Sequence, residues 1–486
     1  MLIKLPREFE VIRLYIQTVC MMFFPSETYS ILEDAEHSVI LGIEIKNRVN
    51  STAVTISVHT SEKQSQADYA AENPEEIASK RYIGNCIYQI LSDFCGTRPS
   101  WGSITGVRPT KLGAVYLAGY GDNAAIKLAE DYLCDPGKAK LAVDTYLRGE
   151  QIARQLPAKT CSLYVSIPFC PTRCNYCSFT SYSTPRLLGL IPAYLERLKD
   201  ELHLTAELIY RNGLQISTVY IGGGTPSTLS ASQLEDLLSA LSRLVDISKL
   251  DEFTVECGRP DTVTREKMDV LKKYSVNRVS INPQTLNDEV LSQIGRAHTT
   301  DDFYRAYEMA RETGIERINT DLIAGLPHDN TDSYLRGIER IIALSPDNIT
   351  QHTFCVKRSA EIKHADADAF DNKGGDIAYS VRESYNLLDA ANYRPYYMYR
   401  QKYTAENLEN TGFEKNNTAC LYNIYMMEEL HSIFAVGAGG VTKIVSPDRT
   451  HIRRIGQAKY PYEYIDGDFP LVNEENLRLI ETVLND

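Results

Sequence analysis

The sequence lacks any hydrophobic run that approaches the length of a membrane-spanning helix. The apolar stretch from Val19 to Phe24 is short, and it follows charged residues without the region order or the cleavage site of a signal peptide. Positive charge is also scarce, with 51 Lys and Arg against 64 Asp and Glu and a formal net charge of −13. Because nucleic acids and anionic membranes require basic surfaces, we expect neither as the main partner. These features predict a soluble, cytoplasmic protein.

Cysteine is sparse for a disulfide scaffold, with eleven in 486 residues, and the uneven distribution indicates reduced thiols. Three of them, Cys170, Cys174 and Cys177, have the spacing Cys-x3-Cys-x2-Cys on a loop after a short apolar stretch. No fourth cysteine or histidine follows at ligand spacing, which argues against a structural zinc site or a four-ligand cluster. A 4Fe–4S cluster held by three cysteines leaves one iron open to a small molecule. The alternative is three unrelated buried thiols.

From Ser162 to about Cys355 the sequence repeats a strand, loop and helix pattern six times. The expected strands are Leu163 to Ile167, Thr218 to Ile221, Glu252 to Glu256, Arg278 to Ile281, Ile318 to Ile323 and Ile349 to Phe354. The expected helices are Ile191 to Arg211, Ala231 to Leu244, Arg265 to Tyr274, Asp302 to Thr313 and Tyr334 to Leu344, with a helical turn near Asp288 to Ile294. Short apolar strands that alternate with helices imply parallel strands joined by right-handed crossovers. The pattern therefore predicts an α/β fold, a partial (β/α)6 barrel of the TIM type.

The two ends of the chain predict α+β structure. We expect an N-terminal domain of unknown role over residues 1–158, the barrel over 159–360, and a C-terminal domain over 361–486. In the N-terminal part, Val39 to Lys46 and Ala53 to Val58 resemble strands, and Ala67 to Phe94 has helical spacing. In the C-terminal part, the aromatic runs Tyr393 to Arg400 and Leu421 to Met427 either cover the barrel mouth or pack as core.

Polar or glycine residues follow almost every expected strand. In strand order they are the three cysteines, Gly222-Gly223-Gly224-Thr225-Pro226, Glu256, Gln284 with Arg296 after it, Asp321 and His352. Functional groups of such barrels gather at the carboxyl ends of the strands, and consecutive glycines let the backbone approach a ligand. Each residue alone is explained by a turn or a surface charge. Their coincidence at one rim favours a binding site.

This ordered set resembles the radical S-adenosylmethionine (SAM) superfamily. Within it, the chain is most similar to the oxygen-independent coproporphyrinogen III oxidase (coproporphyrinogen dehydrogenase) family, in the long form of Gram-positive bacteria. The resemblance is carried by Tyr164-x-Ser166-x-Pro168-Phe169-Cys170, the GGGTP segment, Glu256, Gln284, Arg296 and the stretch from Asn319 to Pro327. It covers the chain from about Cys161 to Gly440.

The resemblance implies that Cys170, Cys174 and Cys177 hold a 4Fe–4S cluster and that one or two SAM molecules bind beside it. It assigns the SAM contacts to residues whose chemistry complements a zwitterion and a sugar: Gly223, Gly224 and Thr225 at the methionine end, Glu256 at the amino group, Arg296 at the carboxylate, and Gln284 and Asp321 at the ribose hydroxyls. Tyr164 is the candidate catalytic residue.

The implied reaction is anaerobic oxidative decarboxylation of coproporphyrinogen III propionates to vinyls, which gives protoporphyrinogen IX. It requires a tetrapyrrole substrate and a low-potential electron donor such as flavodoxin or ferredoxin. Candidate partners for the substrate carboxylates are Lys357, Arg358, Arg394, Arg400, Lys402 and Lys443. Where the best-known oxidases of the family have a histidine two residues after the tyrosine, this chain has Ser166, so no proton-handling role transfers to that position.

Two other functions belong to the same branch of proteins. One is a haem chaperone. Those relatives usually carry a Cys-x-His-Asn segment, whereas this chain has Cys420-Leu421-Tyr422-Asn423 and lacks that axial ligand. The other is radical methylation or ring opening of a haem-like tetrapyrrole, which the sequence leaves open.

Overall fold

The computed structural model describes residues 1–25, 27–30, 37–48, 51–71, 74–77, 79–177, 181–355, 376–401 and 404–485. It contains two compact units: the first is Met1–Tyr146 with Tyr399–Glu409, and the second is Leu147–Met398 with Asn410–Asp486. The division into three domains near residues 158 and 360 stays a prediction. Among the described helices, none combines the length and the apolar character needed to cross a bilayer.

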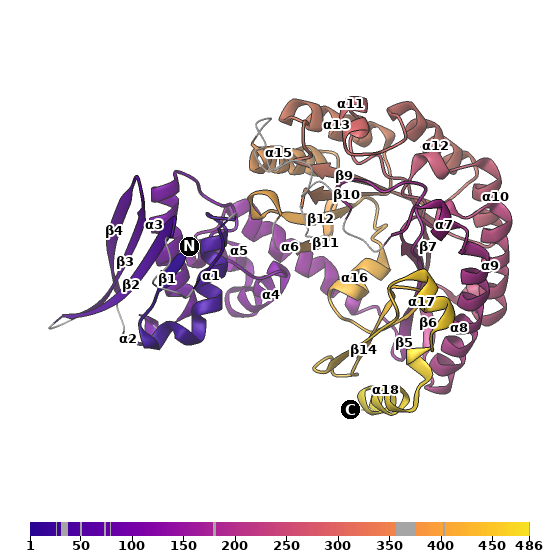
Figure 1. Ribbon diagram of the computed structural model, residues 1–486, viewed down its shortest axis with the longest axis horizontal. Helices are drawn as coiled ribbons and strands as arrows, with labels where there is room; N and C mark the ends of the chain where they lie inside the picture. The colour runs from indigo at the N-terminus through magenta and orange to yellow at the C-terminus, as the bar shows by residue number, and fades with distance from the viewer. Residues whose placement is uncertain are drawn as a thin grey trace. The chain divides into compact units, whose positions relative to one another are not determined.

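The first unit has a four-stranded sheet in the order β1-β2-β3-β4, with helices α1 and α3 contributing to one apolar core (Figure 1). Its strands are β1 (Leu2–Lys4), β2 (Val39–Arg48), β3 (Ser51–Thr60) and β4 (Gln64–Ala71). Its helices are α1 (Arg13–Met21), α2 (Pro74–Ile77), α3 (Lys80–Cys95), α4 (Pro109–Tyr120), α5 (Ala124–Tyr132) and the start of α6 (Pro136–Ala153). The two expected strands form an antiparallel hairpin, β2 and β3.

The helix expected from Ala67 to Phe94 is wrong in its first part. Residues up to Ala71 belong to β4, which pairs antiparallel with β3. Helix α3 begins only at Lys80, where Ser79 Oγ accepts a hydrogen bond from the Tyr82 backbone at 3.1 Å. Pairing with β3 is a long-range contact, so the local spacing of apolar residues does not reveal it.

The second unit is built on an eleven-stranded sheet in the order β11-β12-β10-β9-β8-β7-β6-β5-β13-β14-β15. The central strands are β5 (Thr160–Ile167), β6 (Gln215–Gly223), β7 (Glu252–Glu256), β8 (Arg278–Ser280), β9 (Arg317–Ala324) and β10 (Asn348–Thr353). These six strands are parallel and follow one another in sheet order. The predicted α/β partial barrel is therefore confirmed.

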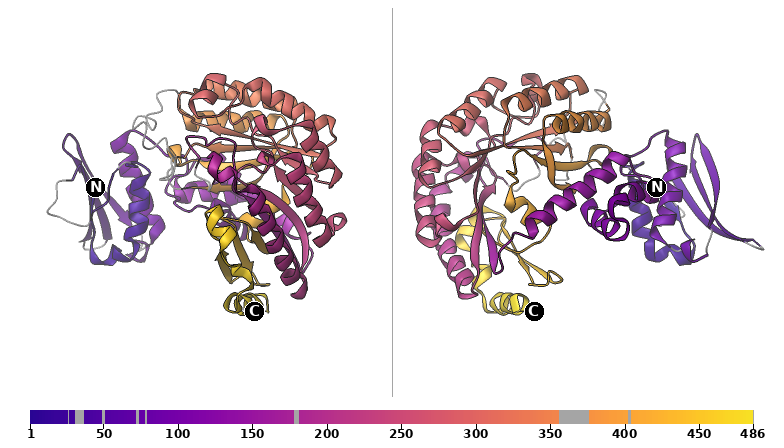
Figure 2. Two further views of the ribbon diagram at one scale, coloured as in Figure 1. Left: turned by 45° about the vertical axis from the view of Figure 1, so that its right-hand side comes forward. Right: turned by 180° about the vertical axis from the view of Figure 1, so that it is seen from behind.

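Helices connect these strands and cover the outside of the curved sheet (Figure 1, Figure 2). They are α7 (Pro185–Leu188), α8 (Ile191–Arg211), α9 (Ala231–Leu244), α10 (Arg265–Lys273), α11 (Asp288–Gln293), α12 (Thr300–Glu312) and α13 (Thr331–Leu344). The later elements are α15 (Ile377–Ala390), β11 (Arg394–Arg400), β12 (Glu409–Glu414), α16 (Leu421–Met427), β13 (Ser432–Val436), β14 (Val441–Val445), β15 (Ile452–Gly456), α17 (Pro461–Asp466) and α18 (Glu474–Asn485). Strand β12 pairs with β10 and β13 pairs with β5, so the chain after residue 376 extends the sheet on both sides.

The two faces of the barrel sheet differ in polarity. Side chains alternate between the faces of a strand, and outward residues such as Leu163, Val219 and Val255 are buried and apolar. In the alternate positions, Tyr164 on β5 pairs with Tyr220 on β6. Tyr220 pairs with Thr254 on β7, and Thr254 pairs with Arg278 on β8. Parallel strands that are buried on both faces are usually apolar throughout. A polar inner face therefore indicates a place for a polar ligand.

Candidate active site

The three cysteines lie on the loop that follows β5. The loop is fixed by backbone hydrogen bonds from Cys170 N to Tyr182 O and from Cys177 N to Cys174 O, each at 3.0 Å. Burial raises the pKa of the Cys170 thiol, and the neighbouring Cys177 and Cys174 thiols raise it further. Cys170 Sγ also lies 3.3 Å from Thr225 Oγ1. The fold thus brings the three predicted ligands near one another and places Cys170 beside the glycine-rich segment.

In the described part of the chain, no three His, Cys, Asp or Glu side chains are placed to bind one metal ion. In an iron–sulfur cluster, cysteine thiolates bind separate irons, so they need not converge on one atom.

The glycine-rich segment packs its backbone directly against the strand and loop that carry the cysteines. Gly224 N donates to Ile167 O and Thr225 N donates to Phe169 O, both at 2.8 Å. A Cβ atom at Gly224 would lie 2.6 Å from Phe169 O, and Gly223 has a φ of 113°. Only glycine fits these two positions without strain. Contact of this segment with a ligand stays a prediction.

Glu256 ends β7 on the inner face. Tyr220 Oη donates a hydrogen bond to Glu256 Oε1 at 2.5 Å, and Gly223 N donates to Oε2 at 3.3 Å. Burial raises the pKa of Glu256 to about 7, an effect that the Tyr220 hydrogen bond opposes and the charge of Asp321 reinforces. A cationic ligand would favour the carboxylate form, so this environment is suited to an ammonium group.

Arg296 and Gln284 each carry a buried polar atom without a hydrogen-bond partner among the described residues, Nε and Oε1 respectively. The guanidinium of Arg296 is held by Gly258 O at 2.9 Å and by Tyr176 Oη at 3.4 Å, which places it against the cysteine loop. Gln284 adopts a φ of 68°, a left-handed conformation uncommon for glutamine. Buried polar groups are rarely left unpaired. Both residues therefore fit a site that a polar ligand completes.

Asp321 lies on β9 in a dense polar cluster. Its two oxygens accept hydrogen bonds from Asn319 Nδ2 at 2.7 Å and from Asn282 Nδ2 at 2.8 Å. His352 on β10 lies with Nε2 3.5 Å from Asp321 Oδ2. Burial lowers the pKa of His352, but the hydrogen bond and charge of Asp321, together with Asn410, outweigh it and raise the pKa above the usual 6.5. Asp321 is thus positioned by neighbours, and its role toward a ribose stays a prediction.

Tyr164 belongs to a stack of three rings on the inner face. Its ring centroid lies 6.1 Å from that of Tyr220 and 6.0 Å from that of Tyr422, and the latter two lie 4.4 Å apart. The nearby Ser166 Oγ donates to Ala438 O at 2.8 Å. Tyr422 belongs to α16, so one of the two aromatic runs contributes directly to the inner face. The catalytic role of Tyr164 stays a prediction.

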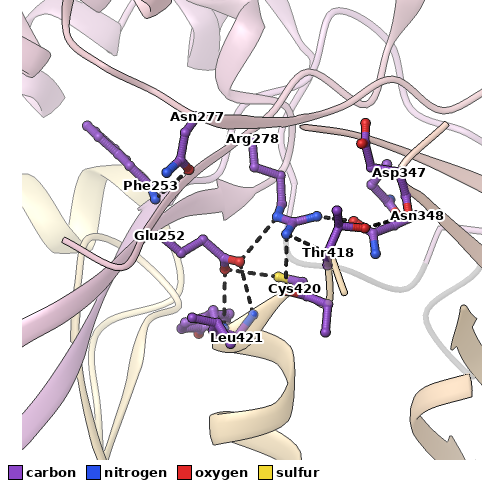
Figure 3. A network of polar contacts seen from close by, with 12 residues as sticks. Glu252, Phe253, Asn277, Arg278, Asp347, Asn348, Thr418, Cys420 and Leu421 are labelled. Carbon is purple, nitrogen blue, oxygen red and sulfur yellow. Dashed lines mark hydrogen bonds and ion pairs between the residues drawn. The ribbon is translucent and has the colours of Figure 1, made fainter. Parts of the chain in front are cut away.

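A buried ion pair that was not predicted from the sequence fixes the start of α16 (Figure 3). Arg278 Nε lies 3.2 Å from Glu252 Oε2, with side chains 1% and 0% exposed. Glu252 also accepts from Leu421 N at 2.9 Å and Tyr422 N at 3.2 Å, while Arg278 Nη2 donates to Thr418 O at 2.7 Å. The pair therefore holds Tyr422 where its ring joins the stack. Its signal in the sequence was a Glu and an Arg at inward positions of adjacent strands.

The basic residues considered for the substrate carboxylates have protein partners where the structure describes them. Arg394 pairs with Asp389 at 2.6 Å, and Lys443 lies 3.7 Å from Glu429. Arg400, in the first unit, is buried and donates to backbone carbonyls. Three candidates lie outside the described residues: Lys357, Arg358 and Lys402.

Comparison with known proteins agrees with this geometry. Residues 164–341 match the model of the radical SAM superfamily. The chain is 32% identical over 415 residues to the oxygen-independent coproporphyrinogen-III oxidase-like protein HemZ of Bacillus subtilis, covering 83% of this chain and 81% of that protein. It is 30% identical over 319 residues to the heme chaperone HemW of B. subtilis, covering 62% and 77%. It is 32% identical over 208 residues to the anaerobic coproporphyrinogen III oxidase 1 of Cereibacter sphaeroides, covering 43% and 45%.

The parallel barrel and the superfamily match define a radical SAM protein. Within that class, the chain belongs to the oxygen-independent coproporphyrinogen III oxidase-like family. The cofactors of the superfamily are a 4Fe–4S cluster and SAM. The site fits them, since it offers three thiols on one loop and unpaired buried polar atoms on Arg296 and Gln284.

Proposed function

We propose that this protein is an oxygen-independent coproporphyrinogen III oxidase, which converts propionate side chains of its tetrapyrrole substrate to vinyls in the cytoplasm. The observation that carries the proposal is the three-cysteine loop beside a polar inner face in a chain that is 32% identical to HemZ over 83% of its length. A low-potential donor such as flavodoxin or ferredoxin supplies the electron that cleaves SAM. Each substrate radical then loses carbon dioxide and one electron, which passes to an electron acceptor, as the vinyl forms.

The residues of the site have separate tasks in this proposal. Cys170, Cys174 and Cys177 hold the cluster. When bound, the cluster and SAM supply a carbon-centred radical that removes a hydrogen atom from the substrate. The protein binds and orients the groups that react, and it keeps water away from them.

The proposal assigns the binding of SAM to residues around the polar inner face. Arg296 faces the carboxylate with its unpaired Nε, and Glu256 faces the amino group in its carboxylate form, which the positive charge of the ammonium favours. Gly223, Gly224 and Thr225 contact the methionine end with their backbone. Gln284 and Asp321 bind the ribose.

Tyr164 orients the reacting groups and excludes water as part of the ring stack with Tyr220 and Tyr422. The Ser166 hydroxyl is engaged by Ala438 O, so the proposal gives it no proton-transfer role. Loss of carbon dioxide from a propionate requires no proton from that position.

The second candidate function is a haem chaperone, which the 30% identity to HemW favours. Two features of the site speak against it. Tyr422, at the position of the chaperone histidine, is buried and its ring is stacked on Tyr220. Cys420 Sγ is buried and donates to Glu252 Oε1 at 3.1 Å. The Tyr422 ring and the Cys420 thiol are thus both engaged by other groups of the protein.

Anaerobic incubation with SAM, a reductant and coproporphyrinogen III tests the proposal. We expect 5′-deoxyadenosine together with a vinyl product from the wild-type protein and from Cys95→Ala, a control that removes a partly exposed thiol of α3. Cys174→Ala should form neither. Deoxyadenosine without a vinyl product would contradict the choice of substrate, and stoichiometric haem binding without turnover would support the chaperone.

A further inference from the structure

Arg259 is buried against the cysteine loop, although nothing in the sequence singled it out. It lies in the loop after β7 and is 3% exposed. Its Nη1 donates to Cys174 Sγ at 3.6 Å and to Thr172 O at 3.3 Å, and its Nη2 donates to Thr172 Oγ1 at 2.8 Å. The Arg259 guanidinium thus donates hydrogen bonds both to a candidate cluster ligand and to the loop that carries it.

We propose that Arg259 is a positioning residue that donates a hydrogen bond to the Cys174 thiolate and raises the reduction potential of the cluster. The proposal rests on the assignment of the three cysteines to a cluster. It does not depend on which tetrapyrrole, if any, the enzyme converts.

The physical basis is the charge of the donor. A hydrogen bond from a guanidinium to a thiolate is charge-assisted, and it becomes stronger as electron density on the sulfur increases. Reduction adds an electron to the cluster, so a buried cation beside one sulfur stabilises the reduced state more than the oxidised state. Asp261 accepts from Arg259 Nε at 3.1 Å and offsets part of the positive charge. That carboxylate is 22% exposed, whereas the Arg259 side chain is 4% exposed, so water screens the acid more than the base.

The three cysteine sulfurs differ in their partners, which makes the proposal specific to Cys174. Cys170 Sγ lies 3.3 Å from the neutral hydroxyl of Thr225, and Cys177 Sγ lies 3.9 Å from that of Ser181. Cys174 has a cationic donor. The iron bound to Cys174 would therefore be the one whose ligand is most strongly polarised by the protein.

A redox titration of the reconstituted full-length protein, followed by EPR without SAM, tests the role of Arg259. We expect Arg259→Gln to retain the cluster and to show a more negative midpoint potential than the wild-type protein. Arg259→Lys, which keeps the charge but not the planar fork, should fall between them. The control is Arg265→Gln on α10, which removes an exposed partner of Glu312 and should leave the potential unchanged.

The outcomes distinguish a failure of the proposed role of Arg259 from a failure of the cysteine assignment. Equal potentials in the wild-type protein and in whichever Arg259 variant retains its cluster would overturn the role of Arg259 and leave the cysteine assignment intact. Loss of the cluster from both variants, with the circular dichroism spectrum unchanged, would also overturn it, because the residue would then only hold the loop. A wild-type protein without a cluster would overturn the cysteine assignment itself, and this proposal with it.

Discussion

Replacement of Glu256 by glutamine should abolish a pH dependence of SAM binding that the wild-type protein shows near neutrality. Burial raises the pKa of Glu256 from 4.5 to about 7. The proposed contact with the SAM amino group requires the carboxylate form. Glutamine keeps the shape of the side chain and an acceptor for the 2.5 Å hydrogen bond from Tyr220 Oη, but it cannot ionise.

The magnitude follows from the ionised fraction. With a pKa of about 7, that fraction is about 10% at pH 6 and about 75% at pH 7.5. The association constant for SAM should therefore rise about eightfold over this range, or about 1.2 kcal/mol. The upper limit of pH 7.5 avoids most of the titration of the SAM amino group, for which α-amino groups give a pKa of about 8.

Calorimetric titration of the unreduced, reconstituted protein with SAM under anaerobic conditions measures this effect. We expect the Glu256→Gln variant to bind more weakly at pH 7.5 and with an affinity nearly independent of pH. A wild-type affinity that does not change with pH, or a variant that keeps the wild-type slope, would refute the assignment of Glu256 to the amino group.

The same raised pKa has a consequence for the apoprotein. Between pH 4.5 and 7 the folded state holds a proton on Glu256 that the unfolded chain has released. The stability that this group contributes is therefore complete below pH 4.5 and is lost as the pH rises through 7. The difference in free energy of unfolding between Glu256→Gln and the wild-type protein should shift by about 2–3 kcal/mol in favour of the variant as the pH rises from 5 to 8. Urea denaturation of both proteins at each pH measures this shift, and a difference in stability that does not change with pH would contradict the raised pKa of Glu256.

The remaining predictions concern the framework of the site. Arg278→Met should lower the free energy of unfolding by about 3–5 kcal/mol, because it leaves Glu252 buried without its cation. Adding Glu252→Gln to this variant should restore part of the lost stability. Urea denaturation measures both effects, and a loss below about 1 kcal/mol in Arg278→Met would contradict a stabilising role of the ion pair. Gly224→Ala should reduce the iron bound after reconstitution, because the added Cβ would lie 2.6 Å from Phe169 O. The control is Gly337→Ala on α13, where no atom lies within reach of an added Cβ. Equal iron content in the two variants would contradict the prediction, because the cysteine loop would then tolerate the displacement of Phe169.

The barrel was predictable because its evidence is local. Each strand and helix of the repeat has its own apolar periodicity, and the cysteine spacing is contained in eight residues, Cys170 to Cys177. The error at residues 67–71 has the opposite cause, since the strand that contains them depends on pairing with β3.

The supporting contacts of the site were not predictable because they join residues far apart in the chain. Arg259 and Cys174 are separated by 85 positions, and Glu252 and Tyr422 by 170. A strand pattern shows that an inward position is polar, but it does not show which partner lies opposite. The polar residues at inward positions of parallel strands were the one available signal that this face is not a plain hydrophobic core.

The central claim is that three cysteines hold a cluster to which SAM binds directly, and EPR of the reconstituted, reduced protein with and without SAM tests it. We predict about four iron atoms per chain and a spectrum that changes when SAM is added. Alanine at Cys170, Cys174 or Cys177 should abolish the signal, whereas Cys95→Ala should leave it unchanged. A full signal in Cys174→Ala, or a wild-type spectrum that SAM does not alter, would contradict the account.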